Sequence, residues 1–123
     1  MLILTIDDNL REFAPGQVIE GIAGWQDEAA PKDAVLRLFW YTEGRGTQDV
    51  NVVAEKEFAM FPSAYEERFQ LILPDQPYSY SGAITSIQWA LELVLNKGKD
   101  VVRVDILVSP WTEKLTLASL EMK

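Results

Sequence analysis

The sequence contains no cysteine and no histidine among its 123 residues. This absence excludes disulfides, thiolate nucleophiles, histidine-based catalytic triads and the common zinc and haem ligand sets. Basic residues are also few, because 11 lysines and arginines stand against 19 acidic residues, for a net charge of −8. Such an acidic chain repels phosphate backbones. We therefore expect no nucleic-acid partner, no cofactor and no metal.

Long apolar runs are absent as well. No stretch approaches the ~20 apolar residues that a membrane helix needs, and charged residues such as Glu92 and Arg103 interrupt the longest apolar segments. The first residues form a short apolar run without the basic region of a signal peptide. We expect a soluble, cytoplasmic protein that does not insert directly into a membrane.

The sequence does have hydrophobic residues at 48%, enough to build a core. The length is that of one domain, so we expect residues 1–123 to form a single domain. No window shows the 3.6-residue period of an amphipathic helix longer than about two turns. The dominant period is two, which is typical of strands with one buried face.

The clearest alternation begins at Thr85. Its apolar positions are Ile87, Trp89, Leu91, Leu93 and Leu95. A similar alternation follows Asp100, and another begins at Tyr65, where Glu67 interrupts the apolar set and suggests a strand end. Residues 34–42 are apolar on both faces except at Arg37, which is typical of a central strand or of one with packing on its outer side. Gly21 and Gly24 lie inside another strand and indicate a bulge or a close backbone approach.

Turn residues separate these runs, and the pattern predicts an all-β fold, an immunoglobulin-like antiparallel β-sandwich of about seven to eight strands. The seven expected strands lie near residues 2–7, 17–26, 33–43, 48–58, 65–73, 84–96 and 101–109. Residues 111–120 could add an eighth strand or cover an open edge.

Three segments resemble the arrestin family in the same order along the chain. Residues 13–21 (FAPGQVIEG) are similar to the Tyr-x-Pro-Gly start of an arrestin-like lobe, with Phe13 in place of the tyrosine. Residues 40–49 (WYTEGRGTQD) resemble its Trp-x-Thr-x-Gly-x-Gly hairpin, and residues 69–91 resemble its Pro-x-Ser-Tyr-x-Gly segment with the following Ile-x-Trp. The resemblance implies one arrestin-type lobe and a non-catalytic adaptor that binds other proteins. Arrestins have two lobes in tandem, whereas this chain is long enough for one.

Several aromatic residues are candidates for partner binding. They are Phe39, Trp40, Tyr41, Tyr78, Tyr80 and Trp111. For Trp40, as for Trp25 and Trp89, core packing is the favoured interpretation. One residue of the trio at 39–41 is expected to reach an outer surface. Tyr78 and Tyr80 either pack at the end of the sandwich or form a recognition loop, and Trp111 either caps the sandwich or is exposed.

Catalytic arrangements are poorly represented. Glu66 and Glu67 are adjacent, so on a strand they point to opposite faces and cannot act together on one substrate. Ser79 has no histidine to activate it. Asp7 and Asp8 match no calcium loop. We therefore expect no enzyme, and the remaining acids are interpreted as solvated turn residues.

Two functions remain. The first is a protein-interaction module that acts as an adaptor or scaffold and binds a protein partner through a sheet edge, an outer sheet face or end loops. In this case self-association as a homodimer could replace the missing second lobe. The alternative is a carbohydrate-binding module that stacks sugars on exposed Trp25, Trp40, Trp111, Tyr78 and Tyr80. Two or more coplanar exposed rings on one face would favour the alternative.

Overall fold

The computed structural model describes residues 1–44, 49–77, 79–81 and 85–109. Within these ranges the chain forms strands and short turns, and no helix is long and apolar enough to cross a membrane. In chain order the strands are β1 (Leu2–Ile6), β2 (Glu12–Phe13), β3 (Val18–Gln26), β4 (Ala34–Gly44), β5 (Val50–Glu57), β6 (Ala64–Ile72), β7 (Tyr80–Ser81), β8 (Thr85–Leu95) and β9 (Asp100–Val108).

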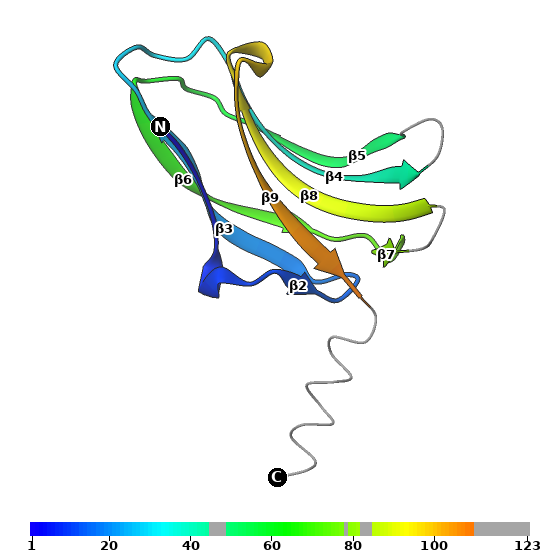
Figure 1. Cartoon of the computed structure of the whole chain (residues 1–123). Helices are drawn as coiled ribbons and strands as arrows, with labels where there is room; N and C mark the ends of the chain where they lie inside the picture. The colour runs from blue at the N-terminus through cyan, green and yellow to red at the C-terminus, as the bar shows by residue number, and fades with distance from the viewer. Residues whose placement is uncertain (45–48, 78, 82–84, 110–123) are drawn as a thin grey trace.

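The strands form two layers (Figure 1). One is a three-stranded sheet in the order β1-β3-β6, and the other is a six-stranded sheet in the order β2-β9-β8-β4-β5, with β7 beside β8. Described neighbours run antiparallel, except that β2 runs parallel to the end of β9. The chain is therefore an all-β sandwich, as its sequence predicts.

The main core lies between the two sheets. Alternate residues of β8, from Trp89 to Leu95, are buried in it, as the period of two predicts. Leu36 and Leu38 of β4 point to the same side, and Trp25 of β3 closes one end of the core from the other sheet. Trp25 and Trp89 are each 1% exposed, which confirms the core interpretation for both. Because both sheets bury apolar rows, the sandwich needs no disulfide.

The boundaries of the seven predicted strands agree with the structure to within two residues. The sequence missed β2 and β7, because a two-residue strand has no detectable period. Residues 111–120, expected to form an eighth strand or to cover an edge, lie outside the described residues.

Glu67 does not mark a strand end, contrary to the sequence prediction. It lies in the middle of β6 and shares the inward parity of Phe69. Its carboxylate accepts a hydrogen bond from the Tyr65 hydroxyl at 3.1 Å and lies 3.5 Å from the ammonium group of Lys56 on β5. Glu67 is tolerated there because these partners compensate the carboxylate where the edges of the two sheets meet.

The arrestin-like motifs have structural roles in this chain. Phe13 is buried beside Val108, and Gly16 adopts φ +79° in the turn that follows Pro15. The Trp89 indole N–H donates to the Pro77 carbonyl at 3.0 Å. The Val108 N–H donates to the Ser79 hydroxyl oxygen at 2.9 Å, and the Ser79 N–H donates to the Val108 carbonyl at 2.8 Å. The motif at residues 77–89 thus fastens a loop to β8 and β9.

Gly24 marks a close backbone approach, which is one of the two alternatives that the sequence left open. A Cβ atom at Gly24 would lie 2.2 Å from the Tyr65 carbonyl oxygen on β6. Gly21 is equally tight, because a Cβ there would lie 2.0 Å from the Thr5 carbonyl oxygen on β1. The three-stranded sheet therefore owes its close strand spacing to these two glycines.

Candidate functional site

The outer face of the six-stranded sheet carries an apolar cluster outside the main core. Phe39 and Tyr41 of β4 share a side because residues two apart on a strand point the same way. The register places Ala90 of β8 directly opposite Phe39. The three side chains form a separate buried cluster, with Phe39 4% and Tyr41 7% exposed. We call Phe39, Tyr41 and Ala90 the outer cluster.

Arg103 of β9 covers the outer cluster. Its guanidinium carbon lies 5.1 Å from the ring centroid of Phe39 and 5.1 Å from that of Tyr41. A guanidinium over two aromatic faces is attracted by both ring quadrupoles. Burial raises the pKa of Tyr41, the Asp105 carboxylate raises it further, and the charge of Arg103 opposes the rise. Arg103 thus shields two rings from water while keeping its own charge at the surface.

A row of alternating charges crosses the same face beside the outer cluster. The register aligns Arg103, Glu92, Arg37 and Glu55 on four consecutive strands. Arg103 and Glu92 approach to 3.6 Å, and so do Arg37 and Glu55. The outer face therefore has sharply defined apolar and charged rows, since residues opposite each other in neighbouring strands share a face.

β5 continues the apolar row to the edge of the sheet. Val50 pairs with Tyr41 and Val52 pairs with Phe39, so both valines lie on the outer face beside the cluster. Val50 is 60% exposed and Val52 is 45% exposed. A bulge follows, because Leu38 pairs with Ala54 and leaves Val53 as an extra residue. Together with the outer cluster, these valines form an apolar strip that runs to a free edge in the described structure.

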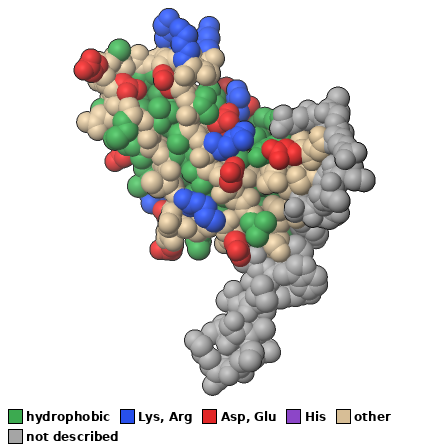
Figure 2. Space-filling model, in the orientation of Figure 1, with side chains coloured by type: hydrophobic (Ala, Val, Ile, Leu, Met, Phe, Trp, Pro, Cys, Tyr) green, Lys and Arg blue, Asp and Glu red, His purple; other side chains and the backbone are tan. Residues whose placement is uncertain are grey.

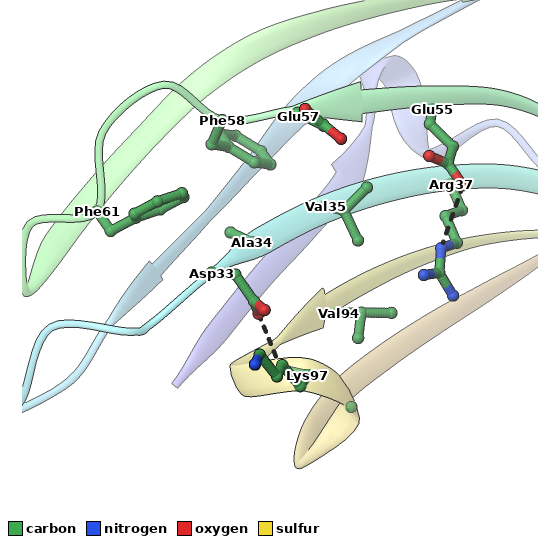
Figure 3. A pocket seen from close by; sticks show the side chains of 11 residues that line it. Asp33, Ala34, Val35, Arg37, Glu55, Glu57, Phe58, Phe61, Val94 and Lys97 are labelled. Atoms are coloured by element: carbon green, nitrogen blue, oxygen red, sulfur yellow. Dashed lines mark hydrogen bonds and ion pairs between the residues drawn. The ribbon is translucent and has the colours of Figure 1, made fainter.

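A hollow of about 620 Å³ lies at the other end of the outer face (Figure 3). Val35 and Val94 lie side by side in it, with Phe58 and Phe61 to one side. The Asp33 carboxylate accepts a hydrogen bond from the Lys97 backbone N–H at 2.8 Å. The lining mixes both signs of charge with apolar side chains. Figure 2 shows a group of basic side chains at the end of the molecule where β8 turns into β9, and Lys97 and Lys99 lie between these two strands.

The structure separates the three predicted aromatic residues of β4. Phe39 and Tyr41 belong to the outer cluster, whereas Trp40 is partly buried and packs against the main core. One of the three was expected on an outer surface, and the register places two there. The expected core packing of Trp40 is confirmed.

The side chains of the other three predicted site residues lie outside the described part of the structure. Tyr78 and Trp111 lie outside the described residues. Tyr80 is placed through its backbone, which pairs with Ile87 of β8. A partner-binding role for Trp111 and for the loop with Tyr78 and Tyr80 therefore stays a prediction.

Sequence reasoning missed Arg103 and the valines of β5. The alternation of β9 indicates that Arg103 points away from the core, but it cannot show that Phe39 lies two strands away. The sequence Val50-Asn-Val-Val53 lacks a clean period, because the bulge shifts the side of each following residue. An unusual cluster of valines before Glu55 was the available signal.

Sugar-stacking rings are not exposed in the described part of the chain. Trp25 is buried, which corrects its place among the exposed sugar-binding candidates. No aromatic residue occurs among the large exposed hydrophobic side chains that are described. The ring pair on the outer face, Phe39 and Tyr41, is tilted by 34° and covered by Arg103. The condition of coplanar exposed rings is therefore not met by these residues.

The described acids do not gather into a metal-binding group of three or more. Asp7 lies in a short turn and pairs with Arg68, while Glu66 and Glu67 point to opposite faces of β6. The Ser79 hydroxyl is engaged by the backbone of β9. The acids and the serine that sequence analysis considered thus take structural positions.

Comparison with known proteins identifies a fold. No family model matches the chain, and no curated protein matches it. Solved structures do match, among them Spo0M, a sporulation control protein from Bacillus subtilis, with a TM-score of 0.60 and 15% sequence identity. The match covers 99% of this chain and 54% of that one, so this chain spans about half the length of Spo0M. At this identity the likeness shows the fold, and it supports an arrestin-like fold for this chain.

Proposed function

We propose that this chain is a non-catalytic module that binds another protein through the outer face of its six-stranded sheet. The observation that carries the proposal is the outer cluster with its exposed continuation at Val50 and Val52. An apolar strip that is bordered by a charged row and runs to a sheet edge left free by the described strands has the composition of a protein-binding patch, with an apolar centre and a polar rim.

The chemistry of the chain agrees with a binding role. It has neither cysteine nor histidine, and the Ser79 hydroxyl is engaged by the backbone N–H of Val108. Spo0M is described as a sporulation control protein, and regulation through binding is the role we propose for this chain as well. As part of the same proposal, residues 1–123 act as one domain in the cytoplasm.

Site-specific cross-linking in the native host tests the proposal. A photoreactive amino acid is placed at Val52 on the six-stranded sheet and, as the matched control, at Ile72 on the three-stranded sheet. Both side chains are exposed and lie on outer faces. We expect a cross-linked protein from position 52 and not from position 72. The partner, identified by mass spectrometry, should then bind the purified chain.

Two outcomes would contradict the proposal. The first is equal cross-linking from positions 52 and 72, and the second is no cross-linking from either position 52 or a second outer-face position, Leu107. Leu107 is exposed on β9. Purified chain that turns over a substrate would also overturn it. A cross-link from Val52 to a second copy of the chain would identify the partner as the chain itself.

A further inference from the structure

The valine half of the edge at β5 lacks most of the usual protection against pairing with another strand. β5 is eight residues long and pairs with β4 on one side, and no described strand covers its other side. Exposed edges are commonly blunted by short strands, proline, lysine or bulges. β5 has no proline, and its lysine, Lys56, is held by Glu67 of β6. The protection that remains is the bulge at Val53 and the outward carboxylates of Glu55 and Glu57.

The other described edge strands differ from β5. β2 has two residues and β1 has five, so both are short. β6 is longer and exposes Ile72 at its end, but its other outward positions include Glu66, Arg68 and Gln70, which are charged or polar. On its side away from β8, β9 has no described strand beside Asp100–Ile106, and there Arg103 and Asp105 alternate with the exposed Val101. β5 instead presents three exposed valines, Val50, Val52 and Val53. Among these long edge strands β5 therefore exposes the largest number of apolar side chains.

The outer face of β5 has two chemically distinct halves. The first half carries Val50 and Val52, and the second carries Glu55 and Glu57. Glu55 lies 3.6 Å from Arg37, whereas no ion pair is present for Glu57 in the described structure. A strand lying alongside would meet apolar side chains at one end and carboxylates at the other.

We infer that an extended segment of a partner protein adds to β5 as a further strand. The partner segment has β-branched or aromatic residues opposite Val50 and Val52 and has lysine or arginine opposite Glu55 and Glu57. Backbone hydrogen bonds supply affinity in such additions, and alternate side chains supply specificity. The net charge of −8 favours a basic segment. The inference rests on the proposed function and names the kind of partner.

Charge also argues against a second copy of the chain at this edge. Antiparallel self-pairing about the middle of β5 would set Val50 opposite Glu57 of the other copy, so the apolar half would face the acidic half. Each copy also carries a net charge of −8. Both effects disfavour the pairing, whereas a basic and apolar strand satisfies both halves.

Peptide binding to the full chain tests the inference. The probes are synthetic peptides matched to the eight residues of β5, with valine and threonine in one half and lysine and threonine in the other, made in both orders. A third peptide has glutamate in place of lysine. Calorimetry should show that one order binds at least about fivefold tighter than the other, because strand direction fixes which halves meet. The glutamate peptide should bind weakest.

Variants of the chain locate the binding edge. Val52→Lys should weaken the preferred peptide by about tenfold, because it places a charge in the apolar half. The matched control is Val101→Lys, since Val101 is 47% exposed on β9, which is separated from β5 by β8 and β4, and it should leave affinity unchanged. Glu57→Lys should weaken the lysine peptide about fivefold and strengthen the glutamate peptide. Tryptophan fluorescence establishes that each variant is folded.

N-methylation separates strand addition from docking of side chains alone. Successive backbone N–H groups of a strand point to opposite edges, so methylating one alternate set should abolish binding and methylating the other should not. Equal effects of the two sets would overturn the inference, as would the absence of peptide binding. If the partner cross-linked through Val52 still binds the Val52→Lys variant, the inference fails while the proposed function stands. Self-association that Val52→Lys abolishes would assign the edge to a second copy and also overturn it.

Discussion

The outer face of the three-stranded sheet is held together by polar side chains, whereas the outer face of the six-stranded sheet holds aromatic rings beneath one arginine. On the first, Arg68 pairs with Asp7 and lies 3.8 Å from Glu20, and Gln70 donates to Glu20 at 3.0 Å. Hydrogen bonding to Asp7 raises the pKa of Arg68. On the second, Arg103 covers Phe39 and Tyr41. A cation thus joins acids on one face and shields an apolar surface on the other.

The difference indicates a division of roles between the sheets. The three-stranded sheet is fixed by its tight glycines, and its outward side chains satisfy one another. The six-stranded sheet keeps apolar area outside the core, which a monomeric protein gains little by retaining. The predictions below begin with the change of largest expected effect.

Gly24→Ala should disrupt the three-stranded sheet. The new Cβ atom would overlap the Tyr65 carbonyl and the backbone of Glu66, so β3 and β6 would have to move apart. We expect the free energy of unfolding to fall by about 3 kcal/mol, measured by urea unfolding with tryptophan fluorescence. Gln26→Ala on the same strand, where the side chain is exposed, is the control and should change little. Equal stability of the two variants would contradict the close approach.

Phe39→Ala should remove the centre of the outer cluster. The ring is buried, but one side of it is covered by Arg103 and not by the main core. We therefore expect a loss of about 2 kcal/mol in the free energy of unfolding, less than truncation of a large core side chain costs. Trp89→Ala in the main core provides the comparison. Both variants are unfolded in urea, and circular dichroism is the signal because Trp89→Ala removes a fluorescent side chain. If Phe39→Ala proved as costly as Trp89→Ala, the outer cluster would have to be regarded as part of the core.

Arg103→Ala should uncover the outer cluster at small cost to stability. Loss of the cation above two rings is expected to lower the free energy of unfolding by about 1 kcal/mol. The sharper readout is binding of an apolar fluorescent dye, which should increase because Phe39 and Tyr41 become accessible. Arg68→Ala on the other sheet removes a cation above polar partners, and it should leave dye binding unchanged. Equal dye binding by Arg103→Ala and Arg68→Ala would contradict the difference between the two outer faces.

The raised pKa of Tyr41 should give the smallest effect, seen at alkaline pH. Below the usual pKa of 10.0 the phenol is neutral in both the folded and the unfolded chain. Above it the unfolded chain ionises first, because burial keeps the folded-state pKa higher, so stability falls as pH rises through the folded-state pKa. Tyr41→Phe should reduce this alkaline loss.

Tyr65 requires its own control. Its hydrogen bond to Glu67 also raises its pKa, so Tyr65 contributes to the alkaline loss of stability as well. Tyr65→Phe separates the contribution of Tyr65 from that of Tyr41. Absorbance of tyrosinate is followed during alkaline titration of the chain and of the two variants. The difference between the chain and each variant gives the pKa of Tyr41 and of Tyr65. A Tyr41 that ionises at its usual pH would show that water reaches the outer cluster past Arg103.

Alternation predicted most of the fold. The row from Trp89 to Leu95 is buried where the period of two places it. The resemblance at residues 13–21 and 77–89 corresponds to a real turn and a real loop anchor. Glu67 was misjudged because its compensating partner, Lys56, lies on a distant strand.

The candidate site was predicted in part. The apolar character of both faces near Phe39 and Tyr41 indicated packing on an outer side, and the outer cluster lies there. The sequence did not identify which of the three neighbours points outward. It did not identify the cover, Arg103, because that contact joins strands far apart in the chain.

By itself, the sequence determined which segments form the seven longer strands, where the turns between them fall and, where the alternation is clean, which side of a strand is buried. These properties are local, because successive side chains alternate across a strand and turn residues act on their own backbone. The tertiary structure decided which strands are neighbours, and so placed Arg103 over the outer cluster and left β5 at an edge. Strand order depends on the packing of all the strands together, and no single segment contains that information.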